Sequence, residues 1–552
     1  MDSSRTWEEP GTTPGAAAPI RIQLASEPAP TFPSRKARPK VSTPTYASRT
    51  KLYAADLDFR PIAAEFHLAT EFPEEVLAAA AQATDRFAAE RIDARSIEFV
   101  TIDPTGSKDL DQAVCIERLD PTATGPDAGP GEGAAAGYRV YYAIADVAAF
   151  VEPGGVIEEK SLRRGQTMYL PDEPVRLHPA RISEDAASLL PNVDRPAVLW
   201  TIDLDAEGEA VSADVRRAVI HSRAQLDYEG VHRDLQSGSL HRGIELLPEV
   251  GKLRQASALR RQAINLNLPS QRVERLADGR FELQIEPRYE VMDYNSEISL
   301  LTGMCAGTMM RRAGRGILRM LEPADDSATD KFRREAATLG FDVPGEGLGQ
   351  VGEFLAAVDV ATPKGLAVMR EAQKLLRGAD YLSLDAAGVE PKIHSEIGGY
   401  YAHVTAPLRR LVDRYATEYC LAICAARRGQ AAGARNEQQG PGNPGVNVPS
   451  WAAERADAVV QAMRETSKTA NQVGRACLRL TEATVLAPWV GHNFPAVVLA
   501  TDEEQRSARI FVTDPPVMAQ CSGAPVEGTE DLVSLVRADV ASREVAFAWP
   551  AD

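Results

Sequence analysis

The segment FVTIDPTGSKDLDQAV, residues 99–114, places three aspartates directly behind an apolar run. Asp109 and Asp111 are two residues apart, so their side chains project to the same side of an extended segment. Asp103 ends the preceding predicted strand, and the Pro-Thr-Gly-Ser segment after it can turn the chain back toward that pair. Three carboxylates at one point repel one another unless a cation neutralises them. Spacing alone leaves two interpretations open, an exposed acidic turn, which is the commoner, and a metal site.

A metal site built from these residues would offer oxygen ligands only. Such sites suit Mg²⁺ or Mn²⁺, and two such ions can activate a water and stabilise the leaving oxygen of a phosphodiester. The spacing does not match a calcium-binding helix-loop-helix loop, which needs acids at alternate positions, a central Gly and a terminal Glu. The candidate metal ligands are therefore Asp103, Asp109 and Asp111, with the amide oxygen of Gln112 as an additional candidate.

The overall composition is typical of a globular protein. The 552 residues, 44% hydrophobic and 25% charged, are too many for one core and favour three or four folding units. The chain has no run of 18 apolar residues and its start is polar and Pro-rich, so we expect no membrane span and no secretory signal. The net charge of −17 argues against a non-specific nucleic-acid coat, although a groove needs only local positive charge.

The six cysteines are scattered, and most lie inside apolar segments. Cys420 and Cys424 are the only close pair, and they lie within a predicted helix without a second pair at zinc spacing. We therefore predict buried free thiols in a reducing cytoplasm.

Composition and periodicity divide the chain into five predicted parts. The first lacks periodicity and is rich in Pro, Ala, Ser and Thr, and the last carries five short strand-like runs. The parts are a disordered tail at 1–48, a small helical N-terminal region at 49–95, a mixed α/β domain at 96–430, a flexible connector and long helix at 431–486, and an all-β OB-fold at 487–552.

The same patterns predict individual elements. Ala-rich sequence with acids in its first turn predicts a helix over 71–92. β-branched and aromatic residues predict strands at 97–103 and 138–151, and an Asp/Gly turn joins two antiparallel strands within 195–224. Ser450 is the predicted N-cap of the long helix, whose apolar residues recur at helical spacing.

FVTIDPTGSKDLDQAV closely resembles the signature of the ribonuclease II (RNB) family of exoribonucleases. That signature has a strand ending in Thr-Ile-Asp, a six-residue step to a second Asp, and an Asp-Leu-Asp-Asp-like run. Four further segments resemble the family in the family's own order: YYAIADVAAFVEPGG, SLRRGQTMYLPDEPVRLHP (161–179), IEPRYEVMDYNSEISLLTG (285–303) and HSEIGGYYAHVTAPLRRLVDR (394–414). Five ordered matches are far more specific than any one motif.

The resemblance implies a mixed α/β RNB-type catalytic domain followed by a C-terminal RNA-binding OB-fold. It implies hydrolysis of single-stranded RNA from the 3′ end to 5′-mononucleotides, with Mg²⁺ as the cofactor and Mn²⁺ as a substitute. Single-stranded RNA is then the expected partner, no membrane is involved, and the cytoplasm is the expected location. The cold-shock-type barrels usual at the N-terminus of the family are not evident in this sequence.

The resemblance also assigns roles to individual residues. The matching positions are Asp103, Asp109 and Asp111 as metal ligands, Asp111 also as the most critical acid, Glu297 as an active-site acid, Arg409 as the catalytic arginine, and Tyr169 as the ring that stacks on the terminal base. Arg409 would neutralise charge on the phosphate during transfer, and its neighbour Arg410 is predicted to contact RNA. Pro407 is placed to start a helix with both arginines in its first turn. Outside the family context, each arginine would simply pair with an acid on a helix face.

Gln112 departs from the family, which has a fourth Asp at this position. A neutral amide contributes no charge, so we expect a weaker hold on a second metal ion. The alternative function is therefore an RNB-like RNA-binding or regulatory protein with reduced or lost nuclease turnover, in which Gln112→Asp should raise activity. A third interpretation is a DNA-directed or endonucleolytic phosphodiesterase, which would release internal fragments.

Overall fold

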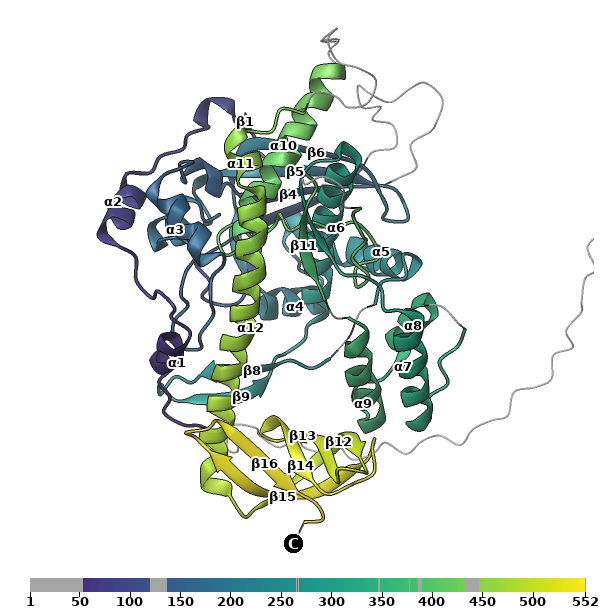
Figure 1. The fold of residues 1–552 in the computed structure, drawn as a ribbon. Helices are drawn as coiled ribbons and strands as arrows, with labels where there is room; N and C mark the ends of the chain where they lie inside the picture. The colour runs from purple at the N-terminus through teal and green to yellow at the C-terminus, as the bar shows by residue number, and fades with distance from the viewer. Residues whose placement is uncertain are drawn as a thin grey trace, which may run out of the picture. The chain divides into compact units, whose positions relative to one another are not determined.

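A computed structural model describes residues 53–119, 137–264, 266, 268–345, 348–376, 378–385, 390–431 and 446–551 (Figure 1). Within these ranges the strands form one large sheet, two small two-stranded sheets and a closed barrel. The disordered tail predicted at 1–48 lies outside the described residues, as does most of the connector predicted after residue 431.

A seven-stranded sheet forms the centre of the α/β region. Its strand order is β1-β6-β5-β4-β3-β2-β7, with antiparallel neighbours from β6 to β2 and a parallel pair at each edge. The strands are β1 (Ile92–Asp93), β2 (Val100–Asp103), β3 (Gln112–Arg118), β4 (Tyr138–Ala145), β5 (Asp194–Leu204), β6 (Ala210–His221) and β7 (Ala224–Asp227). The predictions of a mixed α/β domain and of an antiparallel pair within 195–224 are confirmed.

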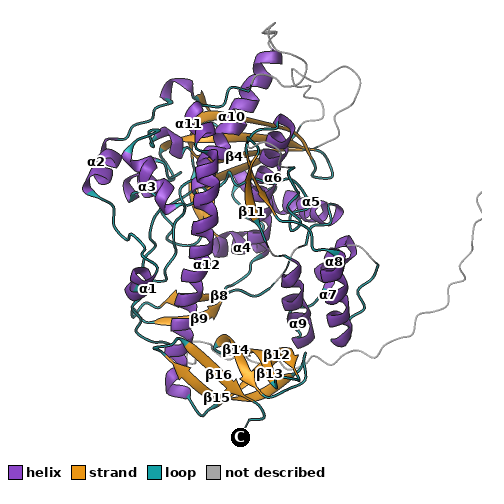
Figure 2. Cartoon of the chain, in the orientation of Figure 1, coloured by secondary structure: helices purple, strands orange, loops and turns teal. Residues whose placement is uncertain are grey.

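The two faces of this sheet pack against different helices (Figure 2). Alternate residues of a strand point to opposite faces, so Val114 and Ile116 of β3 join one core while Ala113 and Cys115 join another. The first core includes α6 (Glu290–Ala313) and α10 (Leu411–Ala431), and the second includes α2 (Glu74–Gln82) and α3 (Val156–Arg164). The candidate site lies where residues just before α10 and residues of α6 meet the ends of β2 and β3.

The long helix α12 (Ala456–Leu486) joins the α/β region to the barrel (Figure 1). Val459 packs in the core of the α/β region, and Leu486 packs in the core of the barrel. The prediction of Ser450 as an N-cap is wrong, because a short helix, α11 (Ser450–Glu454), begins at that residue and is separated from α12 at Arg455.

The C-terminal residues form the predicted five-stranded barrel, which is closed in the order β12-β13-β14-β16-β15. Its strands are β12 (Asn493–Asp502), β13 (Ser507–Thr513), β14 (Pro516–Ser522), β15 (Glu530–Asp539) and β16 (Glu544–Ala548). Leu366 of α9 (Pro363–Ala372) packs against Val497 and Leu499 of β12.

The remaining α-helices and strands are α1 (Arg60–Glu65), α4 (Tyr228–Ser237), α5 (Leu247–Arg260), α7 (Asp326–Thr338), α8 (Leu348–Ala357), β8 (Gln271–Arg275), β9 (Phe281–Ile285), β10 (Ile317–Met320) and β11 (Asp380–Ser383).

The N-terminal segment is less helical than predicted. The helix predicted over 71–92 extends only from Glu74 to Gln82. Asp85 accepts a hydrogen bond from the amide of Phe87 at 2.9 Å, which offers the backbone a local turn in place of a further helical turn. The chain then enters β1, which pairs in parallel with β6 at the edge of the sheet.

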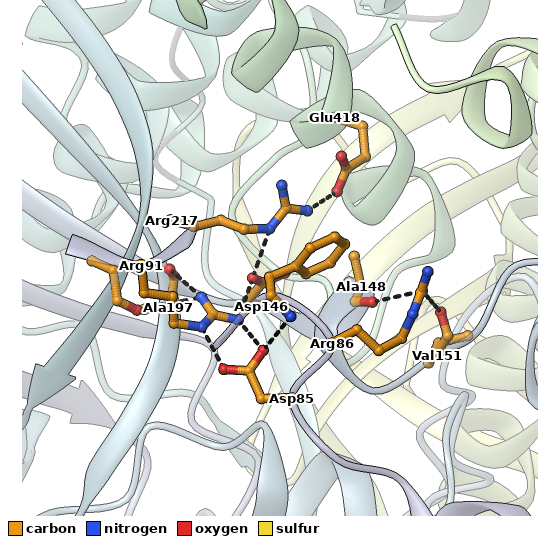
Figure 3. A network of polar contacts seen from close by, with 11 residues as sticks. Asp85, Arg86, Arg91, Asp146, Ala148, Val151, Ala197, Arg217 and Glu418 are labelled. Carbon is orange, nitrogen blue, oxygen red and sulfur yellow. Dashed lines mark hydrogen bonds and ion pairs between the residues drawn. The ribbon is translucent and has the colours of Figure 1, made fainter. Parts of the chain in front are cut away.

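A buried polar network holds this segment against the sheet (Figure 3). Arg91 donates to Asp85 and to Asp146, and its Nη2 atom lies 2.8 Å from Oδ2 of Asp146. Arg217 of β6 links the same Asp146 oxygen, at 3.2 Å, to Glu418 of α10. Removal of one partner from such a buried set leaves an unpaired charge, at a cost of about 3–5 kcal/mol. The network therefore fixes the N-terminal segment, the end of β4 and α10 relative to one another.

Candidate active site

The aspartate loop, residues 103–111, connects the end of β2 to the start of β3. The carbonyl oxygen of Asp111 accepts a hydrogen bond from the amide of Ala145 at 2.9 Å, which continues the pairing of β3 with β4. Ser188 holds the middle of the loop, because its Oγ accepts from the amide of Leu110 at 3.0 Å and donates to the carbonyl of Lys108 at 2.7 Å. The aspartates are thus presented by a backbone that is anchored at several points.

The arginine turn, residues 404–410, meets the aspartate loop at Asp111. The amide of Leu408 donates to Oδ1 of Asp111 at 2.8 Å, and Nε of Arg409 lies 3.3 Å from Oδ2 of the same carboxyl group. The side chain of Arg409 is nevertheless half exposed. The structure therefore brings together the predicted critical acid and the predicted catalytic arginine.

The start of α10 differs from the prediction that both arginines lie in its first turn. The helix begins at Leu411, and the preceding turn is closed by Asp413, whose Oδ1 accepts from the amide of Ala406 at 2.7 Å. Arg410 donates to both oxygens of Asp413, at 2.6 and 2.8 Å. Arg410 is therefore engaged by a buried carboxylate rather than directed at the aspartates, and its contact with RNA stays a prediction.

Tyr169 reaches the same pocket through the segment 165–168, which pairs with the arginine turn. The amide of Thr167 donates to the carbonyl of Arg409 at 2.9 Å, and the amide of Leu411 donates to the carbonyl of Gly165 at 2.9 Å. The Tyr169 residue is 55% exposed, and the charges of Arg409 and the aspartates act on its hydroxyl. An exposed aromatic ring beside an arginine is suited to stacking on a base.

The three carboxyl groups of the aspartate loop have too little positive charge around them to offset their burial. Burial raises the pKa of Asp103 to about 6 and that of Asp111 to about 8, and it also raises the pKa of Asp109. Arg409 opposes the shift at all three positions. Oδ2 of Asp103 is buried and has no hydrogen-bond partner among the described residues. An additional cation would therefore stabilise the ionised carboxylates.

The donor set suits a divalent cation that prefers oxygen ligands, such as Mg²⁺ or Mn²⁺. Across the described ranges, no three His, Cys, Asp or Glu side chains lie together in an arrangement that could hold a metal ion. Asp111 in particular is directed at Leu408 and Arg409. A cation would therefore compete with the Arg409 guanidinium for this carboxylate.

Gln112 is engaged at both ends of its amide. Its Nε2 donates to the carbonyl of Thr405 at 2.7 Å, and its Oε1 accepts from the hydroxyl of Tyr142 at 2.5 Å. Oγ1 of Thr405 lies 2.9 Å from Oγ of Ser299 on α6, which extends the link to that helix. The amide oxygen has a second lone pair beyond the one that accepts from Tyr142, so the use of Gln112 as an additional metal ligand stays a prediction. In this structure, Gln112 ties β3 to the arginine turn.

Glu297 lies on the face of α6 that points away from the aspartates. Ser299 contacts Thr405 of the arginine turn, and residues two apart in an α-helix point in nearly opposite directions. Burial raises the pKa of Glu297, and the charges that oppose this shift are Arg254 of α5 and Arg261 just after it. None of these charges belongs to the aspartate loop, and the active-site role of Glu297 stays a prediction.

Sequence reasoning missed Tyr228, the first residue of α4. β7 pairs in parallel with β2, with Asp227 opposite Asp103, so Tyr228 follows directly beside the aspartate loop. Burial raises the pKa of its phenol, and the charges of Asp103 and Arg409 act on it in opposite directions. Asn295 of α6 donates to its hydroxyl at 3.3 Å. The strand pattern before Tyr228 is visible in the sequence, but the parallel partner of that strand is not.

Comparison with known families agrees with this geometry. The model of the RNB domain matches residues 91–423, which is more than half of the chain. The chain belongs to the RNB family. The RNB match includes the aspartate loop, Tyr169 and the arginine turn. A second model, that of the RNase II-type exonuclease C-terminal S1 domain, matches residues 492–549 and so covers the barrel.

Similar RNB proteins include ribonuclease R of Escherichia coli (strain K12), which is 25% identical over 336 residues. These residues are 58% of this chain but 39% of that protein, so the chain spans less than half the length of this relative. The structure of Mycoplasma genitalium RNase R in complex with ribose-methylated single-stranded RNA matches with a TM-score of 0.73 at 16% identity. This match covers 89% of this chain and 77% of the Mycoplasma chain. The structure of yeast Ssd1, a pseudonuclease, matches with a TM-score of 0.60 at 14% identity and covers 87% of this chain and 58% of the Ssd1 chain. No helix within the described part of this RNB chain has the length and apolar character needed to cross a membrane.

Proposed function

We propose that this RNB protein is a metal-dependent exoribonuclease that hydrolyses single-stranded RNA from its 3′ end to 5′-mononucleotides. One observation carries the proposal: the aspartate loop and the arginine turn meet at Asp111, which contacts the Leu408 amide and the Arg409 guanidinium. An acid that would hold a metal ion and an arginine that would hold a phosphate thus lie in direct contact. The exposed ring of Tyr169 lies beside them.

Each residue would supply a distinct part of the chemistry. The half-exposed Arg409 is accessible to a phosphate and would balance the charge that develops during cleavage. Tyr169 would hold the terminal base by stacking. Asp103, Asp109 and Asp111 would hold Mg²⁺, or Mn²⁺ as a substitute, which supplies an activated water and stabilises the leaving oxygen. The raised pKa values support this assignment, because carboxyl groups that lack positive charge gain most from a cation.

Single-stranded RNA is the proposed partner, and the cytoplasm is the proposed location. The barrel matches a domain of RNase II-type exonucleases, and barrels of the OB type bind single strands through positive charge and base stacking. The six cysteines are free and buried, which is what a reducing compartment favours.

A second candidate is an RNB-like RNA-binding or regulatory protein with reduced or lost turnover. Gln112 favours it, since this position brings no charge to the pocket and its amide is occupied by Thr405 and Tyr142. The likeness to Ssd1 is one of fold alone and does not decide between the two candidates.

Chromatography of the reaction products separates these candidates. The purified chain is incubated with 5′-labelled single-stranded RNA and Mg²⁺ or Mn²⁺, and we expect mononucleotides from the wild type and none from Asp111→Asn. RNA that is bound but intact would support the regulatory candidate, and internal fragments would support an endonucleolytic one. Mononucleotide release that survives Asp111→Asn would contradict the proposed site.

A further inference from the structure

A cavity of about 260 Å³ lies on the side of α6 away from the arginine turn. It is bordered by the start of β6, by α5, by α6 and by the C-terminal part of α10. Leu301, Met304, Thr308 and Arg312 line it along α6, and they recur every three or four residues and so share one face of the helix. Ser299, which contacts the arginine turn, lies on the opposite face of the same helix.

Three arginines line this cavity, Arg254, Arg312 and Arg427, and we call it the arginine cavity. Arg312 and Arg427 are exposed, and neither forms an ion pair or a side-chain hydrogen bond with any residue that the structure describes. Glu209 is the acid of the described lining, and it pairs with Arg254 at 3.3 Å and with Arg260 at 2.6 Å. Two positive charges therefore face the cavity without a partner.

Arg254 supplies a buried wall of the arginine cavity, and it is only 1% exposed. Its Nη1 donates to the carbonyl of Gly208 at 2.7 Å, and its Nη2 lies 3.8 Å from the sulfur of Met304. Its Nε has no hydrogen-bond partner within the described ranges. A buried donor without a partner costs about 1–3 kcal/mol, so an acceptor that enters the cavity and reaches this group would be stabilising.

The rest of the lining is apolar or weakly polar. Leu301, Met304 and Met309 contribute apolar surface, and Ser212 and Thr308 contribute hydroxyl groups. The volume lies below the roughly 300–1,000 Å³ usual for drug-sized ligands. The cavity therefore suits a small molecule with a strongly anionic group and a second part that packs against apolar side chains.

We propose that the arginine cavity binds a small organic phosphate monoester, with its phosphate on Arg312 and Arg427 and its organic part on the apolar side chains of α6. A phosphate monoester carries about two negative charges at neutral pH, which matches the two unpartnered arginines. Guanidinium groups bind phosphate through forked, charge-assisted hydrogen bonds. The site goes beyond the proposed nuclease function and does not depend on it.

A purely structural role for the two exposed arginines leads to a different expectation. Both lie near the C-terminal ends of their helices, where a cation stabilises the helix dipole by roughly 0.3–1 kcal/mol. That role needs no ligand, and it does not account for the cavity, for its apolar floor or for the unpartnered Nε of Arg254.

Isothermal titration calorimetry of the whole chain in EDTA tests the site, with adenosine 5′-monophosphate (AMP) as the probe. We expect AMP to bind, adenosine not to bind, and inorganic phosphate and succinate to bind at least tenfold more weakly than AMP. Arg312→Gln and Arg427→Gln should each weaken AMP binding at least tenfold. Arg334→Gln, at an exposed arginine of α7 that pairs with no described residue, should leave it unchanged.

The same titration with Arg409→Gln distinguishes the arginine cavity from the site formed by Asp103, Asp109, Asp111 and Arg409, which we call the aspartate pocket. AMP binding that persists in Arg409→Gln and is lost in Arg312→Gln supports the proposal. Loss in Arg409→Gln alone, equal binding of AMP, phosphate and succinate, or no AMP binding by the wild type overturns it. Because the readout is binding without metal, absence of RNA hydrolysis would contradict the proposed function and leave this site standing.

Discussion

Helix α6 separates two polar pockets of opposite character. The aspartate pocket sets Asp103, Asp109 and Asp111 against Arg409, whereas the arginine cavity sets Arg254, Arg312 and Arg427 against Glu209. Each holds one buried atom without a partner in the described part of the chain, Oδ2 of Asp103 in the first and Nε of Arg254 in the second. A cluster of charges of one sign favours a ligand of the opposite sign. The first pocket therefore indicates a cation as its ligand, and the second indicates an anion.

The two pockets also differ in how firmly their charges are held. Asp111 is fixed by two hydrogen bonds that it accepts from backbone amides, those of Ala145 and Leu408. Arg312 and Arg427 are exposed side chains at the ends of two helices. We therefore expect substitutions in the aspartate pocket to have the larger effects, and the following predictions run from the largest effect to the smallest.

Arg409→Ala is expected to lower kcat for RNA hydrolysis by about 10²–10³-fold, because it removes the cation that balances charge on the reacting phosphate. Initial rates of mononucleotide release at saturating RNA measure the effect. Arg334→Ala serves as the control for loss of an exposed arginine elsewhere. A loss of less than about threefold would mean that the aspartate pocket does not use Arg409, and the contrast between the two pockets would lose its chemical basis.

Gln112→Asp is expected to lower activity by about tenfold rather than raise it. Aspartate is shorter and cannot donate to the carbonyl of Thr405, so the link between β3 and the arginine turn is lost. The lost hydrogen bond should also cost about 1–3 kcal/mol of unfolding free energy without metal. Denaturant unfolding and initial rates measure both effects, with Gln461→Asp on the exposed surface of α12 as the control. Faster hydrolysis by Gln112→Asp would instead identify this position as a metal-ligand site.

The raised pKa values of Asp103 and Asp111 predict how stability depends on pH. Their folded pKa values of about 6 and about 8 exceed the unfolded value of about 3.9. The folded state therefore binds more protons than the unfolded state in this window, and the stability that these groups contribute falls as pH rises from about 4 to about 8. In EDTA, the Tm of Asp111→Asn relative to the wild type should rise by several degrees between about pH 5 and pH 8. A Tm difference that does not change with pH would contradict the charge imbalance.

Glu297→Gln is expected to change RNA hydrolysis by less than about twofold. Glu297 lies on the α5 side of α6, and the charges near it are Arg254 and Arg261 rather than the aspartates. Initial rates with Asp111→Asn as the positive control provide the measurement. A loss of hydrolysis rate above about tenfold would show that Glu297 acts in the active site, and it would contradict the division of α6 into two functional faces.

The features that could be predicted from the sequence lie within short segments. Asp103, Asp109 and Asp111 lie within one loop, and Arg409 lies in one short run, so both motifs can be recognised in a single sequence. The strands of the barrel were predictable for the same reason, because each is a short run of apolar and β-branched residues bounded by turns.

Side-chain direction and long-range pairing explain what could not be predicted. Glu297 and Ser299 are two residues apart, and the helix axis decides which of them faces the aspartates. Tyr228 reaches the site only because β7 pairs in parallel with β2. The contacts of Gln112 need Thr405, nearly 300 residues away, which a local motif cannot reveal. The arginine cavity likewise draws its three arginines from three separate helices.

The most direct test of the two-pocket interpretation titrates Mn²⁺ and AMP separately into three proteins, the wild type, Asp111→Asn and Arg312→Gln. Asp111→Asn should weaken Mn²⁺ binding at least tenfold and leave AMP binding unchanged, whereas Arg312→Gln should do the reverse. If one substitution weakens both ligands, or if neither substitution weakens either ligand, the assignment of a cation to one face of α6 and an anion to the other is contradicted.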